Sequence, residues 1–268
     1  MPQQPDDGTV ESPPRDRTIR RCLIAGNWKM NGLCAQSRSL AEALADGSED
    51  LPPFIDLTIC PPFTQIAAVG DILAGSRIRL GAQDCHVASA GAFTGDISAA
   101  MLADLNVRYV IVGHSERRLH HFETDELVNA KARAAIEADL TPIVCIGETS
   151  EERDAGIAHE RLSAQIATSL PANFRGVVAY EPIWAIGTGR TASIQEIEET
   201  TAHIRAAVAA HLETDDKSVP ILYGGSVTAR DAASILSINS VGGVLVGGAS
   251  LAADSFLGIA LAAQEALS

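Results

Sequence analysis

Short apolar runs alternate with helix-like stretches along almost the whole chain, and this alternation restricts the folds that the chain can adopt. The runs lie at residues 22–25, 56–60, 78–83, 108–112, 142–146, 177–179, 219–223 and 241–246. Each run is almost continuously hydrophobic, as expected of parallel strands that helices cover on both faces. A chain of 268 residues fits one closed barrel of about 250 residues better than two domains. The sequence therefore predicts a single-domain α/β protein with a (β/α)8 barrel.

The first residues of the chain differ from this pattern. Residues 1–18 contain four prolines and many polar side chains, a composition that is poor at forming a core. We predict a disordered tail at residues 1–18 and a barrel domain at residues 19–268. Within the domain, helical patterns extend over residues 151–170 and 193–211. The second pattern begins with Ser193 and Glu196, which have the spacing of a helix-capping box.

The composition excludes several classes of protein. The net charge is −14 and no cluster of Lys and Arg could neutralise a row of phosphates, so no nucleic-acid partner is expected. No apolar run approaches the roughly 18 residues that a membrane helix needs, so no membrane partner is expected either. The five cysteines are scattered and form no C-x-x-C pair, unlike a disulfide framework or a zinc site. Reduced thiols and a cytoplasmic location are therefore expected.

Polar residues and glycines follow several of the apolar runs. In a closed parallel barrel the C-terminal ends of all strands lie on one rim, so residues that follow different strands meet there. The residues that this rule brings together are Asn27, Lys29, His114, Glu181, Ser226, Gly247 and Gly248. Enzymes with this fold hold their active sites on that rim. We therefore expect a small-molecule site there.

Glu181 ends the sixth run and precedes a loop that contains Pro182 and two glycines. A carboxylate at a strand end beneath a hinged loop is typical of a general base under a lid, here residues 182–192. The stretch alone is equally compatible with a plain connection in which Glu181 caps a helix or faces water. An isolated histidine is more often structural. Because His114 lies on the same rim as Glu181, the pair favours the interpretation of Glu181 as a general base. A histidine can polarise a carbonyl while a carboxylate moves a proton between adjacent carbons.

Glycine pairs follow the seventh and eighth runs, where barrels of this kind bind phosphate through backbone N–H groups. A single Gly-Gly-Ser is more often only a turn, but two glycine pairs at these positions favour a phosphorylated small molecule. Lys29 would add a positive charge for an anionic substrate, unless it lies in a solvated face. The chain has no cluster of metal ligands and no G-x-G-x-x-G motif, so neither a metal nor a cofactor is expected.

A long loop follows the third run. Residues 84–96 carry the apolar side chains of Ala90, Ala92 and Phe93 between glycines. Such a tip is poorly solvated unless it docks into another surface, so a second subunit, and hence a homodimer, is the plainest interpretation. The alternative is an Ω-loop folded on its own surface, and these residues alone favour neither.

Seven motifs, in chain order, resemble those of the triosephosphate isomerase family, and the resemblance runs from about residue 20 to the C-terminus. They are AGNWKMN (25–31), GAFTG (91–95), VIVGHSERR (110–118), CIGE (145–148), AYEPIWAIGTG (179–189), YGGS (223–226) and GGASL (247–251). The resemblance implies a homodimeric enzyme of glycolysis and gluconeogenesis. Such an enzyme interconverts dihydroxyacetone phosphate and D-glyceraldehyde 3-phosphate through an enediolate, without a cofactor. The departures, a longer N-terminal tail and Gly242-Gly243 before the eighth strand, touch no rim residue.

The same resemblance implies a role for each rim residue. Glu181 matches the base and His114 the neutral electrophile, a division of labour for which this family is the well-known example. Asn27 and Lys29 match an electrostatic pair, and Glu116 matches a carboxylate that pairs with the lysine. The positions that match the phosphate-binding backbone groups are Gly187, Ser226, Gly247 and Gly248.

Residues around the rim receive supporting roles from the resemblance. Cys145 matches a buried structural thiol behind the base, and Tyr223 matches a residue that helps to hold the closed lid. Thr94 of the 84–96 loop would reach towards the partner's Asn27, and Gln83 would support the site from within. Arg190 lies at the far hinge of the predicted lid, and the sequence leaves open whether it changes the speed of lid movement.

Two other functions are compatible with the fold. An isomerase of a related sugar phosphate, such as a tetrulose phosphate, would be favoured by an altered lid or an altered loop after the eighth strand, and both are intact. A non-catalytic binding protein would be favoured by loss of Glu181, His114 or Lys29, and all three are present.

Overall fold

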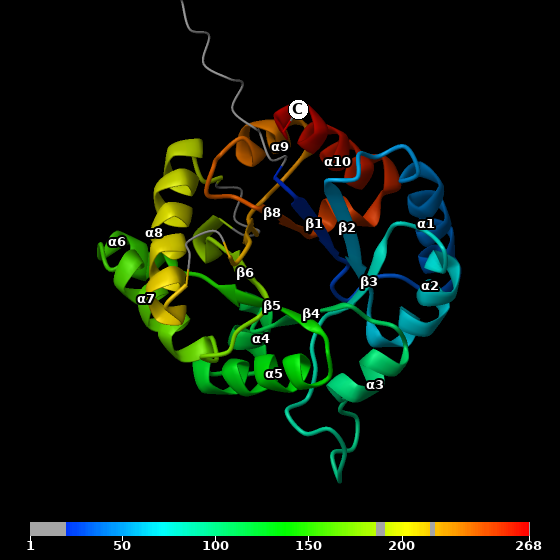
Figure 1. Ribbon diagram of the computed structural model, residues 1–268, viewed down its shortest axis with the longest axis horizontal. Helices are drawn as coiled ribbons and strands as arrows, with labels where there is room; N and C mark the ends of the chain where they lie inside the picture. The colour runs from blue at the N-terminus through cyan, green and yellow to red at the C-terminus, as the bar shows by residue number, and fades with distance from the viewer. Residues whose placement is uncertain (1–19, 186–190, 215–217, 268) are drawn as a thin grey trace, which may run out of the picture.

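Eight parallel strands form one closed barrel in which each strand pairs with the next along the chain and β8 pairs with β1 (Figure 1). The computed structural model describes residues 20–185, 191–214 and 218–267. The strands are β1 (Cys22–Asn27), β2 (Ile55–Cys60), β3 (Arg79–Ala82), β4 (Tyr109–Val112), β5 (Thr141–Ile146), β6 (Val177–Tyr180), β7 (Ile221–Tyr223) and β8 (Gly243–Val246). The predicted (β/α)8 barrel is confirmed. The predicted tail at residues 1–18 lies outside the described residues, so its disorder stays a prediction.

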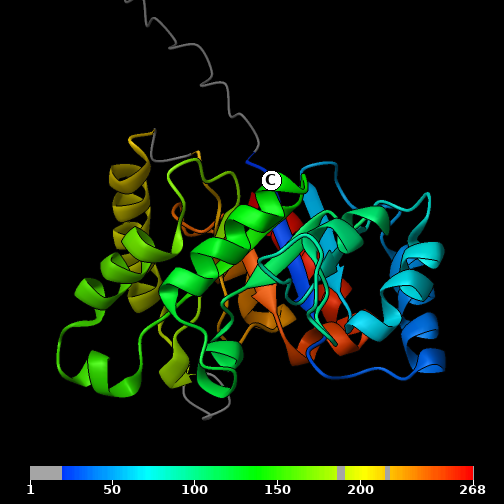
Figure 2. The same cartoon turned by 90° about the horizontal axis from the view of Figure 1, so that it is seen from below.

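Helices surround the barrel as an outer layer (Figure 2). They are α1 (Cys34–Gly47), α2 (Ile66–Leu73), α3 (Ala99–Asp104), α4 (Ser115–His120), α5 (Asp125–Glu137), α6 (Ser150–Asp154), α7 (Ala158–Ser169), α8 (Ile194–Leu212), α9 (Ala229–Leu236) and α10 (Ala253–Leu267). In the described part of the chain, none of these helices has both the length and the apolar character needed to cross a membrane.

Strand residues alternate between two hydrophobic cores, because successive side chains of a strand point to opposite faces. The larger core lies between strands and helices and contains side chains such as Ile24, Val110 and Phe256. A smaller cluster fills the inside of the barrel with small and branched side chains. Its buried members are Leu23, Ala25, Cys60, Ile111, Ile143, Cys145, Val177, Ala179, Leu222 and Leu245. The barrel interior is therefore packed, and ligands are left to the rim.

The barrel closes between its last and first strands at a position that only glycine can occupy. Gly243 has a φ of +153°, and a Cβ atom there would lie 1.9 Å from the backbone oxygen of Leu23. The register of this pair joins Leu23 to Gly243 and Gly26 to Val246. The Gly242-Gly243 pair, which departs from the family pattern, thus lets β8 approach β1 closely.

One predicted helix is wrong in its extent, because residues 151–170 form two helices. α6 ends at Asp154 and α7 begins at Ala158. Gly156 lies between them with a φ of +74°, a left-handed conformation that interrupts a helix. The predicted capping box of α8 is confirmed, since the Ser193 side chain accepts from the Glu196 N–H and the Glu196 carboxylate accepts from the Ser193 N–H.

Candidate active site

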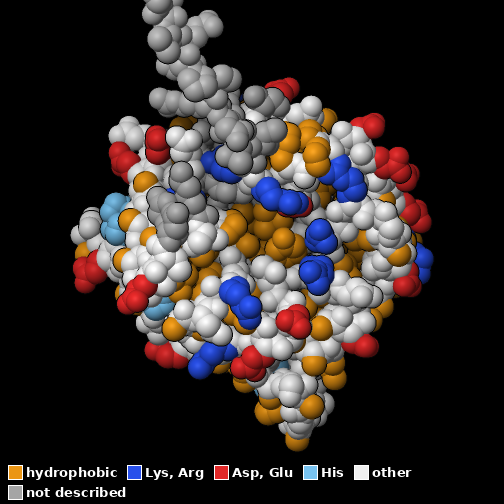
Figure 3. Space-filling model, in the orientation of Figure 1, with side chains coloured by type: hydrophobic (Ala, Val, Ile, Leu, Met, Phe, Trp, Pro, Cys, Tyr) orange, Lys and Arg blue, Asp and Glu red, His pale blue; other side chains and the backbone are white. Residues whose placement is uncertain are grey.

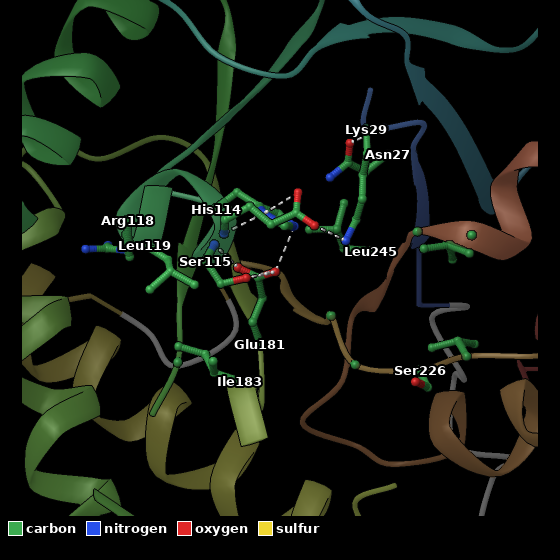
Figure 4. A pocket seen from close by; sticks show the side chains of 18 of the residues that line it. Asn27, Lys29, His114, Ser115, Arg118, Leu119, Glu181, Ile183, Ser226 and Leu245 are labelled. Atoms are coloured by element: carbon green, nitrogen blue, oxygen red, sulfur yellow. Dashed lines mark hydrogen bonds and ion pairs between the residues drawn. The ribbon is translucent and has the colours of Figure 1, made fainter. Parts of the chain in front are cut away.

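A cavity of about 820 Å³ opens at the C-terminal rim of the barrel. Figure 4 shows Glu181 and His114 pointing towards each other, with Lys29 beside them and Ser226 further away. The predicted site residues that line the cavity are Asn27, Lys29, His114, Glu116, Glu181, Ser226, Gly247 and Gly248. They come from the ends of β1, β4, β6, β7 and β8, so the barrel brings together residues that are far apart in the sequence. Gly187, the remaining predicted site residue, lies outside the described residues.

Glu181 directly follows β6 and its side chain is almost fully buried, with 2% of the residue exposed. Its backbone N–H donates to the Ile146 carbonyl at 2.8 Å, which continues the pairing of β6 with β5. Glycines flank it on both neighbouring strands. A Cβ at Gly147 would lie 1.9 Å from the Glu181 carbonyl oxygen, and a Cβ at Gly224 would lie 3.1 Å from the Glu181 Cγ. Gly147 thus makes room for the Glu181 backbone, and Gly224 makes room for its side chain.

Three donors surround the Glu181 carboxylate. The Ser115 backbone N–H donates to Oε2 at 2.9 Å, the Ser115 hydroxyl donates to Oε1 at 3.2 Å, and His114 Nε2 lies 2.9 Å from Oε1. Burial alone would raise the pKa of Glu181, but the charge and hydrogen bond of His114 and the Ser115 donors outweigh it and lower that pKa. The carboxylate is therefore ionised at neutral pH and able to accept a proton. To reach a substrate carbon it must exchange these partners.

His114 is the N-cap of α4, and its Nδ1 atom accepts the backbone N–H of Glu116 at 3.2 Å. In the neutral ring Nδ1 therefore carries no proton, and the ring proton sits on Nε2, facing Glu181. Burial alone would lower the pKa of His114, but the Glu181 charge and hydrogen bond outweigh it and raise the pKa, with a smaller contribution from Glu116. Without the Glu181 partner, burial and the bond at Nδ1 would favour a neutral imidazole that can donate from Nε2.

Lys29 is held in a left-handed backbone conformation, with a φ of +52°. The Asn27 side chain accepts the Lys29 backbone N–H at 3.0 Å, and the Gln83 amide donates to the Lys29 carbonyl at 2.8 Å. Lys29 Nζ lies 2.6 Å from Glu116 Oε1. These contacts fix the ammonium group at the edge of the cavity. The left-handed backbone of Lys29 is strained, and strained backbone conformations persist only where neighbouring residues hold them. They are typical of residues in functional sites.

Gly247 and Gly248 follow β8 and leave the backbone open beside Lys29, since a Cβ at Gly247 would lie 3.4 Å from the Lys29 Cε. A Cβ at Gly248 would meet no atom within 4 Å, and Gly248 begins the short 3₁₀ helix Gly248–Leu251. The Ser250 hydroxyl donates to the Gly247 carbonyl at 2.6 Å and so fixes this turn. An anion can approach the backbone at Gly248 without meeting a side chain, and the Lys29 ammonium group lies close to Gly247.

The comparisons with known proteins agree with one another. A sequence model described as triosephosphate isomerase matches residues 22–263. A triosephosphate isomerase of Gluconacetobacter diazotrophicus is 56% identical, and the match covers 91% of this chain and 99% of the relative. A triosephosphate isomerase of Granulibacter bethesdensis is 52% identical, and the match covers 90% of this chain and 98% of the relative. The crystal structure of triosephosphate isomerase from Bartonella henselae has a TM-score of 0.84 and 38% identity, and covers 91% of this chain and 99% of its own.

The chain belongs to the triosephosphate isomerase family.

Two residues to which the triosephosphate isomerase resemblance gave supporting roles lie directly beneath the site. Cys145 is fully buried inside the barrel, where burial and the nearby Glu181 carboxylate raise the pKa of its thiol well above the usual value. The thiol is thus protonated and unreactive, as a structural role requires. Tyr223 is buried beneath Gly225, and a Cβ at Gly225 would lie 2.2 Å from its hydroxyl oxygen.

The predicted lid of this family member is only partly described. Residues 186–190, which include Gly187 and Arg190, lie outside the described residues, so the role of Tyr223 in holding the closed lid stays a prediction and the effect of Arg190 stays open. At the start of the lid segment, Trp184 donates from Nε1 to Glu148 Oε1 at 2.8 Å, and Tyr180 donates to the same oxygen at 3.0 Å. The buried Glu148 therefore anchors the point where the loop leaves the barrel.

Two residues of the site were not singled out from the sequence. Ser115 lies within the GHSER segment, and its place at the start of a helix after a strand is a signal for a donor to an anion. Gln165 lies in α7, in the outer helix layer, and lines the cavity. No pattern marks it, because a glutamine in an amphipathic helix normally faces water. Among the described residues, no three His, Cys, Asp or Glu side chains are grouped to hold a metal ion.

Proposed function

We propose that the protein interconverts dihydroxyacetone phosphate and D-glyceraldehyde 3-phosphate, in glycolysis and gluconeogenesis. The observation that carries this function is the buried, ionised Glu181 within 2.9 Å of His114, on the same rim as an open glycine turn. A base, an oxygen-polarising group and an anion-accepting backbone are the parts that a proton shift within a sugar phosphate needs. Membership of the triosephosphate isomerase family supports the same reaction.

In this mechanism Glu181 removes a proton from the carbon next to the substrate carbonyl. The electron pair of the broken C–H bond moves to form the carbon–carbon double bond of an enediolate, and the carbonyl oxygen gains negative charge. His114 donates a hydrogen bond from Nε2 to that oxygen, and Lys29 and Asn27 face the developing charge. His114 transfers the proton of the neighbouring hydroxyl group to that oxygen, so the hydroxyl oxygen becomes the new carbonyl, and Glu181 returns its proton to the carbon that carried the original carbonyl. All protons and electron pairs stay among the substrate, Glu181 and His114, so no cofactor is needed.

The phosphate group would be held away from the reacting carbons. We assign it to the backbone N–H groups of Gly187, Ser226, Gly247 and Gly248, which lie on the lid and after β7 and β8. Glu116 orients Lys29 through their 2.6 Å ion pair and supports the His114 ring through its own backbone N–H. Closure of residues 182–192 over the substrate would exclude water from the enediolate.

A homodimer through the 84–96 loop is part of the proposal. This loop projects from the barrel beside α3, and hydrophobic side chains gather at its tip (Figure 3). Phe93 at the tip is 47% exposed, and Met30 and Phe122 elsewhere on the surface are 96% and 82% exposed. Apolar side chains so exposed suit a surface that a second copy covers. Thr94 would then reach towards the partner's Asn27.

A cytoplasmic location fits the cysteines. All five are free thiols, and Cys22, Cys60 and Cys85 have pKa values that burial raises to about 12, which keeps them unreactive. A reducing compartment would keep the exposed Cys34 in the same state.

The test of the function is a coupled assay. D-glyceraldehyde 3-phosphate is added to the purified protein, and dihydroxyacetone phosphate is detected through a dehydrogenase that consumes NADH. We expect turnover that is saturable in substrate and far above that of a Glu181→Ala variant. A rate no higher than that of the variant would overturn the proposal.

A further inference from the structure

Gln165 is a buried amide that joins the outer helix layer to the rim of the barrel. It lies in α7 with 2% of its surface exposed. Its side-chain oxygen accepts the backbone N–H of Gly147 at 2.8 Å. Because a backbone N–H can bond only to the oxygen of the amide, this contact also fixes which way the amide faces.

Gly147 in turn touches the backbone of the proposed base. It follows β5, and its Cα lies so close to Glu181 that a Cβ would be 1.9 Å from the Glu181 carbonyl oxygen and 3.0 Å from its carbonyl carbon. The preceding residue, Ile146, accepts the Glu181 N–H at 2.8 Å. Ile146, the last residue of β5, and Gly147, which follows it, therefore contact both polar groups of the Glu181 peptide backbone.

We propose that Gln165 is a positioning residue for the isomerisation, acting through Gly147 on the place of Glu181. A glycine between a strand and a loop has great conformational freedom, and the buried bond to Gln165 removes it. If Gly147 shifted, the carbonyl of Glu181 would lose the surface against which it packs. A displacement of about 1 Å at a reacting group can cost roughly 100-fold in rate, so a fixed Gly147 matters for catalysis.

Gln165 is better suited to this task than an apolar residue at the same position. Its amide nitrogen has no hydrogen-bond partner among the residues that the structure describes, and the side chain lines the active-site cavity. A side chain of equal length without the oxygen would fill the same space but leave the Gly147 N–H buried and unsatisfied. The oxygen atom, not the bulk of the side chain, is thus the functional part.

The experiment compares Gln165→Met with Gln165→Glu in the full chain. Met retains the length and loses the oxygen acceptor, so we expect kcat to fall about 10- to 100-fold while KM changes little, because the proposed phosphate contacts come from other strands. Glu retains the oxygen, so we expect it to recover most of kcat. Gln195→Met is the matched control on the exposed face of α8 and should leave kcat and KM unchanged.

Two results would overturn the proposal: wild-type kcat in Gln165→Met, or an equal loss in Gln165→Met and Gln165→Glu. Hydrogen exchange in the wild-type protein provides a second measurement that does not depend on how the variants fold. The Gly147 backbone N–H should exchange as slowly as the Glu181 backbone N–H. If the Gly147 N–H exchanged as fast as surface amides, this result would also overturn the proposal.

The inference rests on the proposed function, and the two fail differently. If the wild-type protein does not convert D-glyceraldehyde 3-phosphate, the proposed function fails. If it does, and Glu181→Ala removes the activity while Gln165→Met retains it, only the positioning role of Gln165 fails.

Discussion

His114 Nε2 lies 2.9 Å from Glu181 Oε1, so the proposed electrophile and the proposed base are partners before any substrate arrives. Each shifts the pKa of the other, that of Glu181 downwards and that of His114 upwards. The contacts of ionised Glu181 therefore stabilise the folded protein above pH 4.5, the ordinary pKa of a glutamate. This stabilisation is lost as the pH falls through the lowered pKa of Glu181. The contact of protonated His114 with Glu181 stabilises the folded protein below pH 6.5, the ordinary pKa of a histidine. This stabilisation is lost as the pH rises through the raised pKa of His114.

Ser115→Ala should move the acidic limb of the pH profile. The Ser115 hydroxyl stabilises the charged form of Glu181 and helps to lower its pKa, so removing it raises that pKa. Activity needs the ionised base, and kcat/KM in the variant should therefore begin to fall at a higher pH than in the wild type. Turnover near pH 8 should change little, because the Ser115 backbone N–H remains. The profile of kcat/KM against pH measures this, and an acidic limb that stays in place or moves to lower pH would contradict it.

Glu181→Ala should remove catalysis without removing the anion site. We expect kcat to fall by about 10³-fold, the usual scale for loss of a general base. Calorimetric titration with inorganic phosphate should still show binding, because three of the four proposed phosphate contacts, Ser226, Gly247 and Gly248, follow β7 and β8. Glu160→Ala, at an exposed position of α7, is the matched carboxylate control. Turnover near the wild-type level in Glu181→Ala would rule out the assigned role.

The barrel and the rim could be predicted from the sequence because both follow from local patterns. Apolar runs indicate strands, and a closed barrel places the residues that follow them on one rim. The positions of Lys29 and Glu181 could therefore be predicted without knowledge of side-chain contacts. What could not be predicted depends on three-dimensional packing. The bond from Gln165 to Gly147 joins a helix to a loop 18 residues earlier, and nothing in an amphipathic pattern marks it. The break at Gly156 was also missed, because one glycine in a helical pattern is often tolerated.

Phe93→Asp should convert a dimer into monomers. Phe93 is at the apolar tip of the 84–96 loop, and a carboxylate there would have to be desolvated in an interface. We expect the wild type to have the mass of a dimer by light scattering and the variant that of a monomer at the same concentration. Leu261→Asp, which also replaces an exposed apolar side chain on α10, should leave the dimer intact. A wild-type monomer with full activity would exclude the proposed assembly.

Lys131→Met should destabilise the fold strongly. Lys131 Nζ is buried in α5 and lies 2.7 Å from Asp84 Oδ1 and 2.6 Å from Glu123 Oε1. The variant removes one of the two cations that bind these carboxylates, while Arg117 remains 2.8 Å from Asp84 and 2.6 Å from Glu123, so we expect a loss of about 1–3 kcal/mol. Urea unfolding should show the decrease, whereas Arg133→Met, at an exposed position of the same helix, should be within about 0.5 kcal/mol of the wild type. Equal stabilities for the two variants would show that the cluster contributes little.

The Glu123 carboxylate gives this cluster a pH dependence of known sign. Burial alone would raise its pKa, but Lys131 and Arg117 outweigh burial and lower it. Its contribution to stability is therefore lost as the pH falls through the lowered value. The difference in unfolding free energy between the wild type and Lys131→Met should accordingly shrink in acid.

Because β8 pairs with β1, the barrel can close only after the last strand has been synthesised. Asn27 and Lys29 follow the first strand, which leaves the ribosome early, whereas Gly247 and Gly248 follow the last. A nascent chain that ends before residue 243 has an open sheet edge and lacks these glycines. It can therefore neither close around the interior cluster nor complete the proposed anion site, so we expect enzyme activity only after almost the whole chain has been translated.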